Sequence, residues 1–266
     1  MSINDWQVHL YMSDIEVIIQ QGLQQNLNED VFSVVYKNKK LWVKKARKTG
    51  SRRFHKLVYS IYKHPLIIPV ENKDLKQAVA HESSKIQRLY KLGISVPKVI
   101  KTTNEYFILE DCGPTVNDLM HKQLVDNPMD LFEKIIIELA TLHNLKEFHG
   151  SSQIKNFTYT DGQVYFIDFE ESFNKEIDME ELQFRDLFLF LLSLSRLDTK
   201  LDYEILIKKY IQLTDNKDVI QKFHTLISKV SVLMKIIKNK TVWKLIDNDT
   251  KGIYKLLLQI KDTTNS

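Results

Sequence analysis

The sequence predicts an α+β fold in which a small β-sheet lobe precedes a larger helical lobe. Most runs of β-branched and aromatic residues fall in the first part of the chain, whereas the last third carries apolar residues at helical spacing. With 266 residues, 43% of them hydrophobic, the chain is long enough to bury a substantial core. We therefore expect one domain, 1–266, with an N-terminal lobe of residues 1–111 and a hinge and C-terminal lobe of residues 112–266.

Composition narrows the class of protein. The 38 Lys and Arg against 34 Asp and Glu give a net charge of +4, too small to indicate nucleic acid as a partner. The single cysteine, Cys112, excludes an internal disulfide and a cysteine-rich zinc site. The N-terminus lacks the pattern of a secretion signal, and the longest apolar run, 187–194, is far shorter than the roughly 20 residues of a membrane span. We expect a soluble, cytoplasmic protein.

The first hundred residues predict a hairpin between helices. After an amphipathic segment at 14–25, residues 31–38 and 40–47 are typical of two strands joined near Asn38-Lys39. Residues 47–63 combine helical spacing of apolar residues with many Lys and Arg, so we expect a basic amphipathic helix there. By default such a helix presents a solvated charged face. The alternative is peripheral contact with anionic lipid headgroups or a phosphorylated saccharide, at the inner face of the membrane.

The remaining elements follow from caps and periodicity. A helix is expected from Asp74 to Leu92, with Gly93 placed where a helix end favours a left-handed residue. Two short strands are expected in the sequences KVIKTT and EYFILED. Further helices are predicted at 130–148, 179–197, 203–213 and 219–238 and in a last segment through 260. One strand, VYFIDFE, is predicted between the first two of these helices.

The segment HGSSQIKN, 149–156, carries the first chemical signal, and IDFE follows it at 167–170. Together they place a histidine, an amide and a carboxylate, His149, Asn156 and Asp168, around a loop and the end of a strand. A carbonyl oxygen and a carboxylate that converge in this way suit Mg²⁺, which prefers oxygen ligands. Asn156 could be an ordinary loop residue and Asp168 could simply start a turn, but their joint spacing with His149 favours metal binding by Asn156 and Asp168.

This order and spacing resemble the catalytic loop and metal-binding aspartate of protein kinases. Upstream, LWVK resembles the kinase strand that carries a phosphate-binding lysine, and AHESSKIQRL resembles the helix that supplies its carboxylate partner. The resemblance implies that Lys44 holds the phosphates of ATP and that Glu82 orients Lys44. Lys45 is the alternative, because adjacent strand residues point to opposite faces.

Within the kinase-like superfamily, residues 31–197 are similar to the bacterial lipopolysaccharide kinases, the branch of Kdo and core heptose kinases. Trp42, Gln153 and Glu171 share in this likeness. The resemblance implies a two-lobed kinase-like fold, a hinge at Glu110 to Cys112 whose backbone meets the adenine, and Asp186 bracing the catalytic loop from beneath.

Two positions depart from the kinase pattern. Ser151 stands where the general-base aspartate belongs, and serine cannot hold a proton as a base near neutral pH. We hypothesise that Glu170 or Glu171 supplies a second metal ligand or the missing base, while Gln153 orients the acceptor hydroxyl. Residues 24–33 also lack the glycines of the loop that covers the phosphates in kinases.

The sequence thus favours a phosphotransferase that uses ATP and Mg²⁺ and acts on a hydroxyl acceptor, for which the resemblance suggests a lipopolysaccharide-core sugar. One alternative is a pseudokinase, a scaffold that binds nucleotide or a protein partner, for which Ser151 and the absence of glycine in 24–33 are the evidence. Another is an atypical bacterial Ser/Thr kinase that phosphorylates protein.

Overall fold

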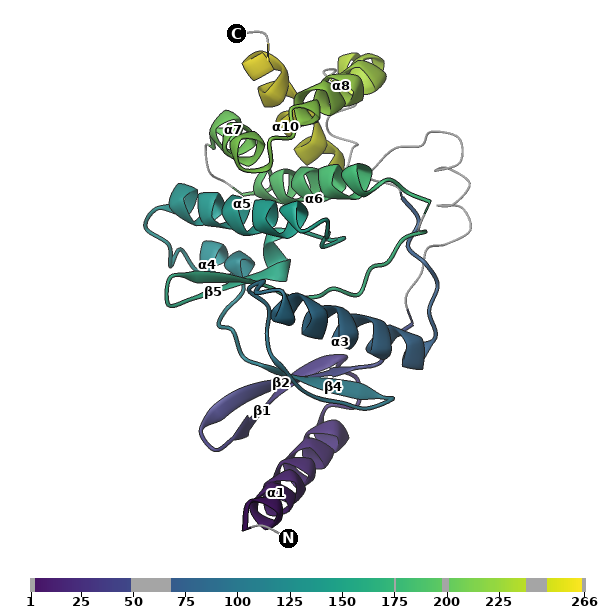
Figure 1. Ribbon diagram of the computed structural model, residues 1–266. Helices are drawn as coiled ribbons and strands as arrows, with labels where there is room; N and C mark the ends of the chain where they lie inside the picture. Colours follow the sequence, from purple (N-terminus) through teal and green to yellow (C-terminus); the bar gives the residue numbers. More distant parts are fainter. Residues whose placement is uncertain (1–2, 49–67, 175, 198–200, 238–247, 265–266) are drawn as a thin grey trace.

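The computed structural model describes residues 3–48, 68–174, 176–197, 201–237 and 248–264, which form two lobes (Figure 1). The N-terminal lobe holds helices α1 (Ile3–Gln25) and α3 (Leu75–Lys91) and strands β1 (Val31–Tyr36), β2 (Lys39–Lys45), β3 (Val99–Thr102) and β4 (Tyr106–Glu110). The other lobe holds α4 (Val116–His121), α5 (Pro128–Asn144), the 3₁₀ turn η2 (Ile154–Asn156), β5 (Phe157–Thr160), β6 (Gln163–Phe166), α6 (Met179–Leu194), α7 (Tyr203–Thr214), α8 (Asp218–Ile237) and α10 (Asn248–Thr264). The predicted α+β class is confirmed.

The four-stranded sheet is antiparallel in the order β1-β2-β4-β3. The predicted hairpin is present, but its turn lies at Lys37 and Asn38, and Lys39 already pairs with Tyr36. Both turn residues have positive φ, 49° and 61°, which suits a two-residue hairpin turn. The turn therefore begins one residue earlier than the prediction placed it.

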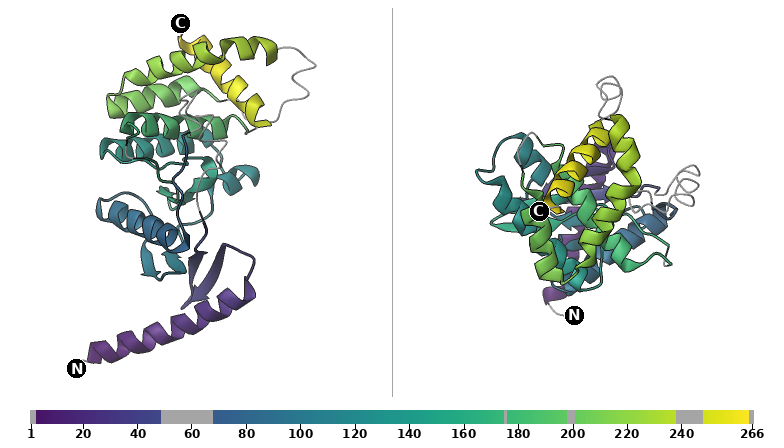
Figure 2. Two further views of the ribbon diagram at one scale, coloured as in Figure 1. Left: turned by 90° about the vertical axis from the view of Figure 1, so that its right-hand side faces the viewer. Right: turned by 90° about the horizontal axis from the view of Figure 1, so that it is seen from above.

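Helix α1 covers one face of this sheet. Its Ile15 and Ile19 pack with Phe32, Val34 and other buried residues of β1, β2 and β4. Gly22 permits the close approach, because a Cβ at this position would lie 2.7 Å from the Phe32 ring. Figure 2 shows α1 at the end of the molecule away from the helical lobe. Among the described residues the chain passes from α1 directly into β1, so no strand of the sheet precedes the hairpin.

Helix α3 covers the opposite face of the sheet. A capping box fixes its start: the Asp74 carboxylate accepts from the Gln77 amide, and the Gln77 side chain accepts from the Asp74 amide. Beyond its end, Gly93 has the left-handed φ of 80° that the sequence predicted. Val79 and Ile86 of α3 join Phe107 in the large core. This face of the sheet is the one that meets the rest of the molecule.

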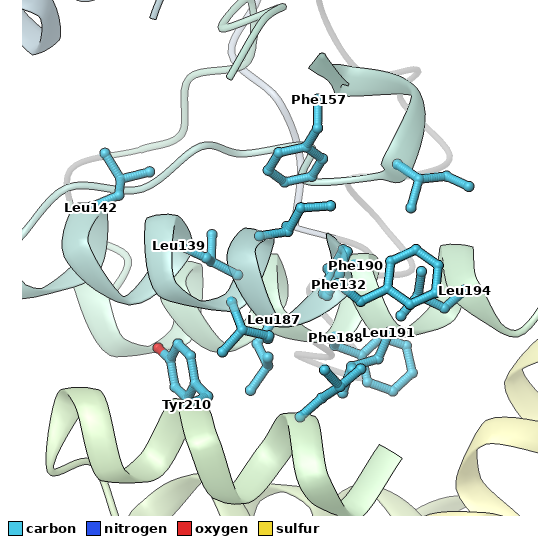
Figure 3. Packing of buried hydrophobic residues seen from close by; sticks show 14 of the residues in the cluster. Phe132, Leu139, Leu142, Phe157, Leu187, Phe188, Phe190, Leu191, Leu194 and Tyr210 are labelled. Atoms are coloured by element: carbon cyan, nitrogen blue, oxygen red, sulfur yellow. The ribbon is translucent and has the colours of Figure 1, made fainter. Parts of the chain in front are cut away.

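The helical lobe is built around aromatic and leucine side chains of α5 and α6 (Figure 3). Phe132 of α5 packs edge-on against Phe190 of α6, which also contacts Phe157 of β5. Helix α10 packs against α8 and α6 (Figure 2). The core thus anchors the β5-β6 hairpin, which carries the predicted metal-binding residues at its ends.

The structure bears on one of the two expectations about membranes and not on the other. In the part of the chain that the structure describes, no helix is both long enough and apolar enough to cross a bilayer. The basic helix predicted at 47–63 lies outside the described residues except for Arg47 and Lys48, so it stays a prediction.

Candidate functional site

Lys44 lies at the centre of the candidate site. It projects from β2 on the face that meets α3, where its backbone is opposite Phe107 of β4. Its Nζ lies 2.7 Å from Glu82 Oε1 on α3 and 2.5 Å from Asp168 Oδ1 after β6. Lys44 and Glu82 are buried, with exposed fractions of 8% and 4%. One ammonium therefore joins the sheet, helix α3 and the segment after β6.

The charges of this cluster follow from burial and pairing. Burial favours the neutral amine of Lys44, but the carboxylates of Glu82 and Asp168 outweigh it and raise the pKa of Lys44 above its ordinary value. Burial raises the pKa of Glu82, and the Lys44 ammonium offsets this only in part. Burial also favours a higher pKa for Asp168, but the Lys44 ammonium outweighs burial and holds this pKa below its usual range. Lys44 and Asp168 are thus both charged at neutral pH.

Lys45, the alternative strand lysine, faces away from the cluster. Its Nζ donates to the backbone carbonyl of Asn26, 2.6 Å away, in the turn after α1. Residues 24–33 form the end of α1, this turn and the start of β1. They therefore do not form the glycine-rich hairpin with which kinases cover phosphates, and Lys44 is the lysine that reaches the cluster.

The loop that begins at His149 is held from beneath by Asp186 of α6. The Asp186 carboxylate is fully buried and accepts from the amides of His149 and Gly150 at 2.6 and 2.8 Å. Ser152 Oγ donates to the Asp186 carbonyl at 2.5 Å. Burial raises the pKa of Asp186, but the hydrogen bond from His143 and nearby charges lower it overall, so the brace is anionic.

His149 is a structural residue of the loop. Its ring packs at a tilt against Phe169 with a centroid distance of 4.5 Å, and its Nε2 lies 2.9 Å from the Ile167 carbonyl. Because the residue is buried, its pKa is lowered to about 4, and the imidazole is neutral at pH 7. The ring thus connects the loop to the segment that bears Asp168.

Asn156 and Asp168 flank the β5-β6 hairpin, and the hairpin brings them together. The Ile167 amide donates to the Asn156 carbonyl at 3.0 Å, so Asp168 follows directly beside Asn156. Asn156 Nδ2 donates to the Ser151 carbonyl at 2.7 Å, which leaves the amide oxygen available to bind a cation. Asp168 has φ of 69°, an uncommon conformation for a residue other than glycine that often marks functional positions.

This pair fits Mg²⁺ better than a transition metal. Within the described ranges no group of three or more His, Cys, Asp or Glu side chains is placed to hold a metal. Mg²⁺ is usually bound by one or two protein oxygens together with water and phosphate oxygens. Asn156 and Asp168 supply such a pair, next to the Lys44 ammonium.

The two glutamates after Asp168 are both paired with arginine. Arg47 at the end of β2 donates Nε to Glu170 Oε2 at 2.7 Å, and its Nη2 contacts the same oxygen. Arg185 of α6 lies with Nη2 3.1 Å from Glu171 Oε2. Burial raises the pKa of Glu171 despite Arg185. The two glutamate side chains are similarly half-buried, and Glu170 lines a small pocket together with Lys44 and Glu82.

The other predicted site residues lie around this centre. Gln153 is half-buried, and its backbone N–H donates to the Ser151 carbonyl at 2.8 Å. Glu110 is exposed at the end of β4, and Cys112 is half-buried between the lobes. Burial, with Glu110 and a neighbouring aspartate, raises the pKa of the Cys112 thiol to about 12, so this thiol is not a nucleophile.

Sequence reasoning missed three contacts of the site. Trp42, two residues before Lys44 and on the same face of β2, donates its indole N–H to Asp111 at 2.6 Å in the connection between the lobes. Because strand residues two apart lie on the same face, the sequence could have placed Trp42 on the side of the site. Lys85, one helical turn after Glu82, is buried 4.0 Å from the Phe148 ring, and burial lowers its pKa to about 8. Nothing in the sequence signals the pairing of Arg47 with Glu170.

The buried neutral His149 predicts a pH dependence of stability. Between pH 6.5 and about 4 the unfolded chain binds a proton at this residue that the folded chain does not, so stability falls as pH falls. We expect the free energy of unfolding to drop by about 2 kcal/mol from pH 7 to pH 5 through His149. Denaturant unfolding of wild type and His149→Gln at both pH values measures this contribution.

Burial also lowers the pKa of His81 to about 4. His81 therefore adds the same pH dependence of the unfolding free energy to wild type and to His149→Gln. The difference between the two slopes therefore belongs to His149. Equal slopes in the two proteins would contradict the prediction.

Comparisons with known proteins bear on the whole arrangement. The profile of the family described as RIO domain matches residues 30–192. An uncharacterized protein of Haemophilus influenzae is 25% identical over 186 residues, 69% of this chain and 70% of that protein. The KEOPS complex subunit Bud32 of Pyrococcus abyssi is 26% identical over 112 residues, 41% of this chain and about half of the subunit (51%). A solved structure, WaaP in complex with acyl carrier protein, has a TM-score of 0.46 and 13% identity, covering 82% of this chain and 85% of that chain.

Proposed function

The chain belongs to the RIO domain family of the protein-kinase-like superfamily, and from this premise we propose that it is a phosphotransferase that uses ATP and Mg²⁺ and acts on a hydroxyl acceptor. The family match covers β1 through most of α6, and so includes both lobes of the candidate site. It confirms the kinase-like resemblance inferred from the motifs.

One observation carries the proposal: a single buried ammonium, Lys44, bonds both Glu82 and Asp168. An isolated lysine and glutamate usually form a surface pair of little consequence. Here the pair of Lys44 and Glu82 is buried between a strand and a helix. The Lys44 ammonium also bonds the carboxylate of Asp168, which lies beside Asn156. A lysine next to a metal-type carboxylate and amide is the arrangement that phosphoryl transfer needs, because the reaction depends on positioning and on neutralising charge.

In this proposal each group has one role. Lys44 binds the phosphates, Glu82 holds Lys44 in place, and Asn156 and Asp168 bind Mg²⁺. The bound metal neutralises negative charge on the phosphates. Asp186 keeps the loop amides in position from beneath. By the resemblance, the backbone between Glu110 and Cys112 meets the adenine.

The acceptor is proposed on the likeness to lipopolysaccharide kinases, which favours a saccharide hydroxyl over a protein side chain. Incubation with γ-labelled ATP and a bacterial extract, followed by separate recovery of the saccharide-lipid and protein fractions, tests the choice. Label in the saccharide-lipid fraction supports the proposal, and label confined to protein supports the protein-kinase alternative. Asp168→Ala serves as the inactive control.

Glu170 is proposed as the residue that assists the acceptor in place of the aspartate missing at Ser151, with Gln153 orienting the hydroxyl. Both described hydrogen bonds from Arg47 to Glu170 go to Oε2, so Oε1 is the oxygen left to take a proton from an acceptor. We expect Glu170→Gln to lower the transfer rate by roughly 10²–10⁴-fold, the usual contribution of a general base, with little change in ATP affinity. Single-turnover kinetics measure the rate.

Arg47→Gln is the matched control, because it removes the same ion pair and keeps the carboxylate. It should cost less than about 1 kcal/mol of stability, as expected for a half-exposed pair, and it should leave the transfer rate high. Equal rates for Glu170→Gln and wild type would rule out the role of Glu170. Glu171→Gln then tests the other glutamate in the same assay.

A second candidate, a pseudokinase that binds nucleotide and serves as a scaffold, has its own supporting observation. Ser151 replaces the base, and both nearby glutamates are engaged by Arg47 and Arg185. Binding of MgATP without transfer of label to either fraction would favour it.

A further inference from the structure

A cavity of about 380 Å³ opens in the helical lobe, outside the candidate site. It lies where the carboxyl ends of α5 and α7 meet the amino ends of α6 and α8. Its volume is within the range of small-molecule sites, about 300–1,000 Å³. Its wall is polar, and it contains His143 and the charged residues Lys146, Glu180, Asp215, Lys217 and Asp218.

The wall carries exposed charges of both signs, most of them without an ion-pair partner among the described residues. Lys146, Lys217, Asp215 and Asp218 form no ion pair with any residue that the structure describes. The fifth charged residue, Glu180, has only a distant contact of 3.8 Å to a lysine outside the cavity. The wall thus presents both ammonium and carboxylate groups to solvent. The wall is therefore complementary to a ligand that carries both charges.

From this geometry we propose that the cavity binds a small zwitterion, a molecule with one ammonium and one carboxylate or phosphate group. The carboxylates of Asp215 and Asp218 hold the ammonium, and the ammonium groups of Lys146 and Lys217 hold the anionic group. Charge-assisted hydrogen bonds of this type are stronger than neutral ones and give orientation as well as affinity.

The floor of the cavity is connected to the catalytic loop. His143 lines the cavity, and its Nδ1 lies 2.6 Å from the Tyr210 hydroxyl, while its Nε2 lies 3.4 Å from Asp186. Asp186 in turn accepts from the amides of His149 and Gly150. A ligand that fixes the end of α5 therefore also fixes the position of Asp186. We assign the cavity as an effector site, and this regulatory part rests on the proposed phosphotransferase function.

Calorimetry on the nucleotide-free full-length protein tests the binding site directly. The probes are glycine, β-alanine, γ-aminobutyrate and ε-aminocaproate, each compared with the alkylamine and the alkanoate of matching length. We expect at least one zwitterion to bind at one site per chain, roughly tenfold or more tightly than either half, a difference of about 1.4 kcal/mol.

Variants at the exposed rim locate the site. Lys217→Gln and Asp215→Asn each should weaken binding about tenfold, because each removes one of the two charge contacts. Lys122→Gln, an exposed lysine in the loop after α4, is the matched control and should bind as wild type does. The proposal is overturned if no zwitterion binds more tightly than its halves, or if the rim variants bind as the control does.

Hydrogen exchange tests the connection to the loop without any nucleotide. Saturation with the best zwitterion should slow exchange of the His149 and Gly150 amides by roughly fivefold or more in wild type, the lower end of typical coupling between sites. In Tyr210→Phe, which removes only the hydroxyl next to His143, the slowing should be lost while binding persists. Unchanged exchange in wild type with ligand bound would refute the effector role. Neither measurement depends on ATP binding, so a failure of the proposed function would show separately.

Discussion

Asp186→Ala is expected to lower the free energy of unfolding by about 2–5 kcal/mol and to abolish measurable phosphotransfer. The carboxylate is fully buried, and its removal leaves the amides of His149 and Gly150 without their acceptors. Unpaired buried amides cost about 1–3 kcal/mol each, and the loop that carries Asn156 loses its support. Denaturant unfolding and a phosphotransfer assay with γ-labelled ATP measure the two effects.

Asp178→Ala is the matched control, an aspartate-to-alanine change at the start of the same helix. Asp178 caps α6 by accepting from the Glu180 amide at 3.1 Å. Losing such a cap costs about 1 kcal/mol and should leave transfer intact. If the two variants lost the same stability and the same activity, the brace assigned to Asp186 would be wrong.

Lys44→Met should reduce phosphotransfer by roughly 10²–10³-fold, the loss typical of one preorganised charge contact in a catalytic site. Methionine keeps most of the length and apolar stem of lysine but removes the ammonium that bonds Glu82 and Asp168. Stability should fall as well, because two carboxylates then lie close together without a cation. Initial rates at saturating acceptor and ATP, together with thermal unfolding, measure both losses.

Lys45→Met separates this effect from any general change in β2. Lys45 is the next residue, but its ammonium bonds the carbonyl of Asn26 on the other face of the sheet. Its replacement should change the transfer rate only slightly. A loss in Lys45→Met as large as that in Lys44→Met would contradict the assignment of Lys44.

Local signals predicted much of the fold. A capping residue and a terminal glycine bound the helix that is predicted from Asp74, and the structure places α3 at Leu75–Lys91. The hairpin was found because its strands are rich in β-branched and aromatic residues, with an error of one residue at the turn. These features depend on neighbours within a few residues, which is why a single sequence reveals them.

Contacts between distant segments are harder to predict from the sequence. The resemblance to kinases placed Lys44, Glu82, Asn156 and Asp168 in one site, and the structure brings all four together. The extension of α1 to Ile3 and the pairing of Arg47 with Glu170 had no local signal. The cavity at the helix ends forms where four helices meet, so no local sequence motif predicts it.

The most direct test of the central claim is a calorimetric titration of ATP, with and without Mg²⁺, on the intact protein and on Asp168→Ala. Asp168 lies within reach of Lys44 and beside Asn156, so its loss should remove the metal while leaving the fold. We predict saturable ATP binding that requires Mg²⁺ and disappears in Asp168→Ala. Absence of binding in the intact protein, or equal binding in the variant, would contradict a kinase-type nucleotide site.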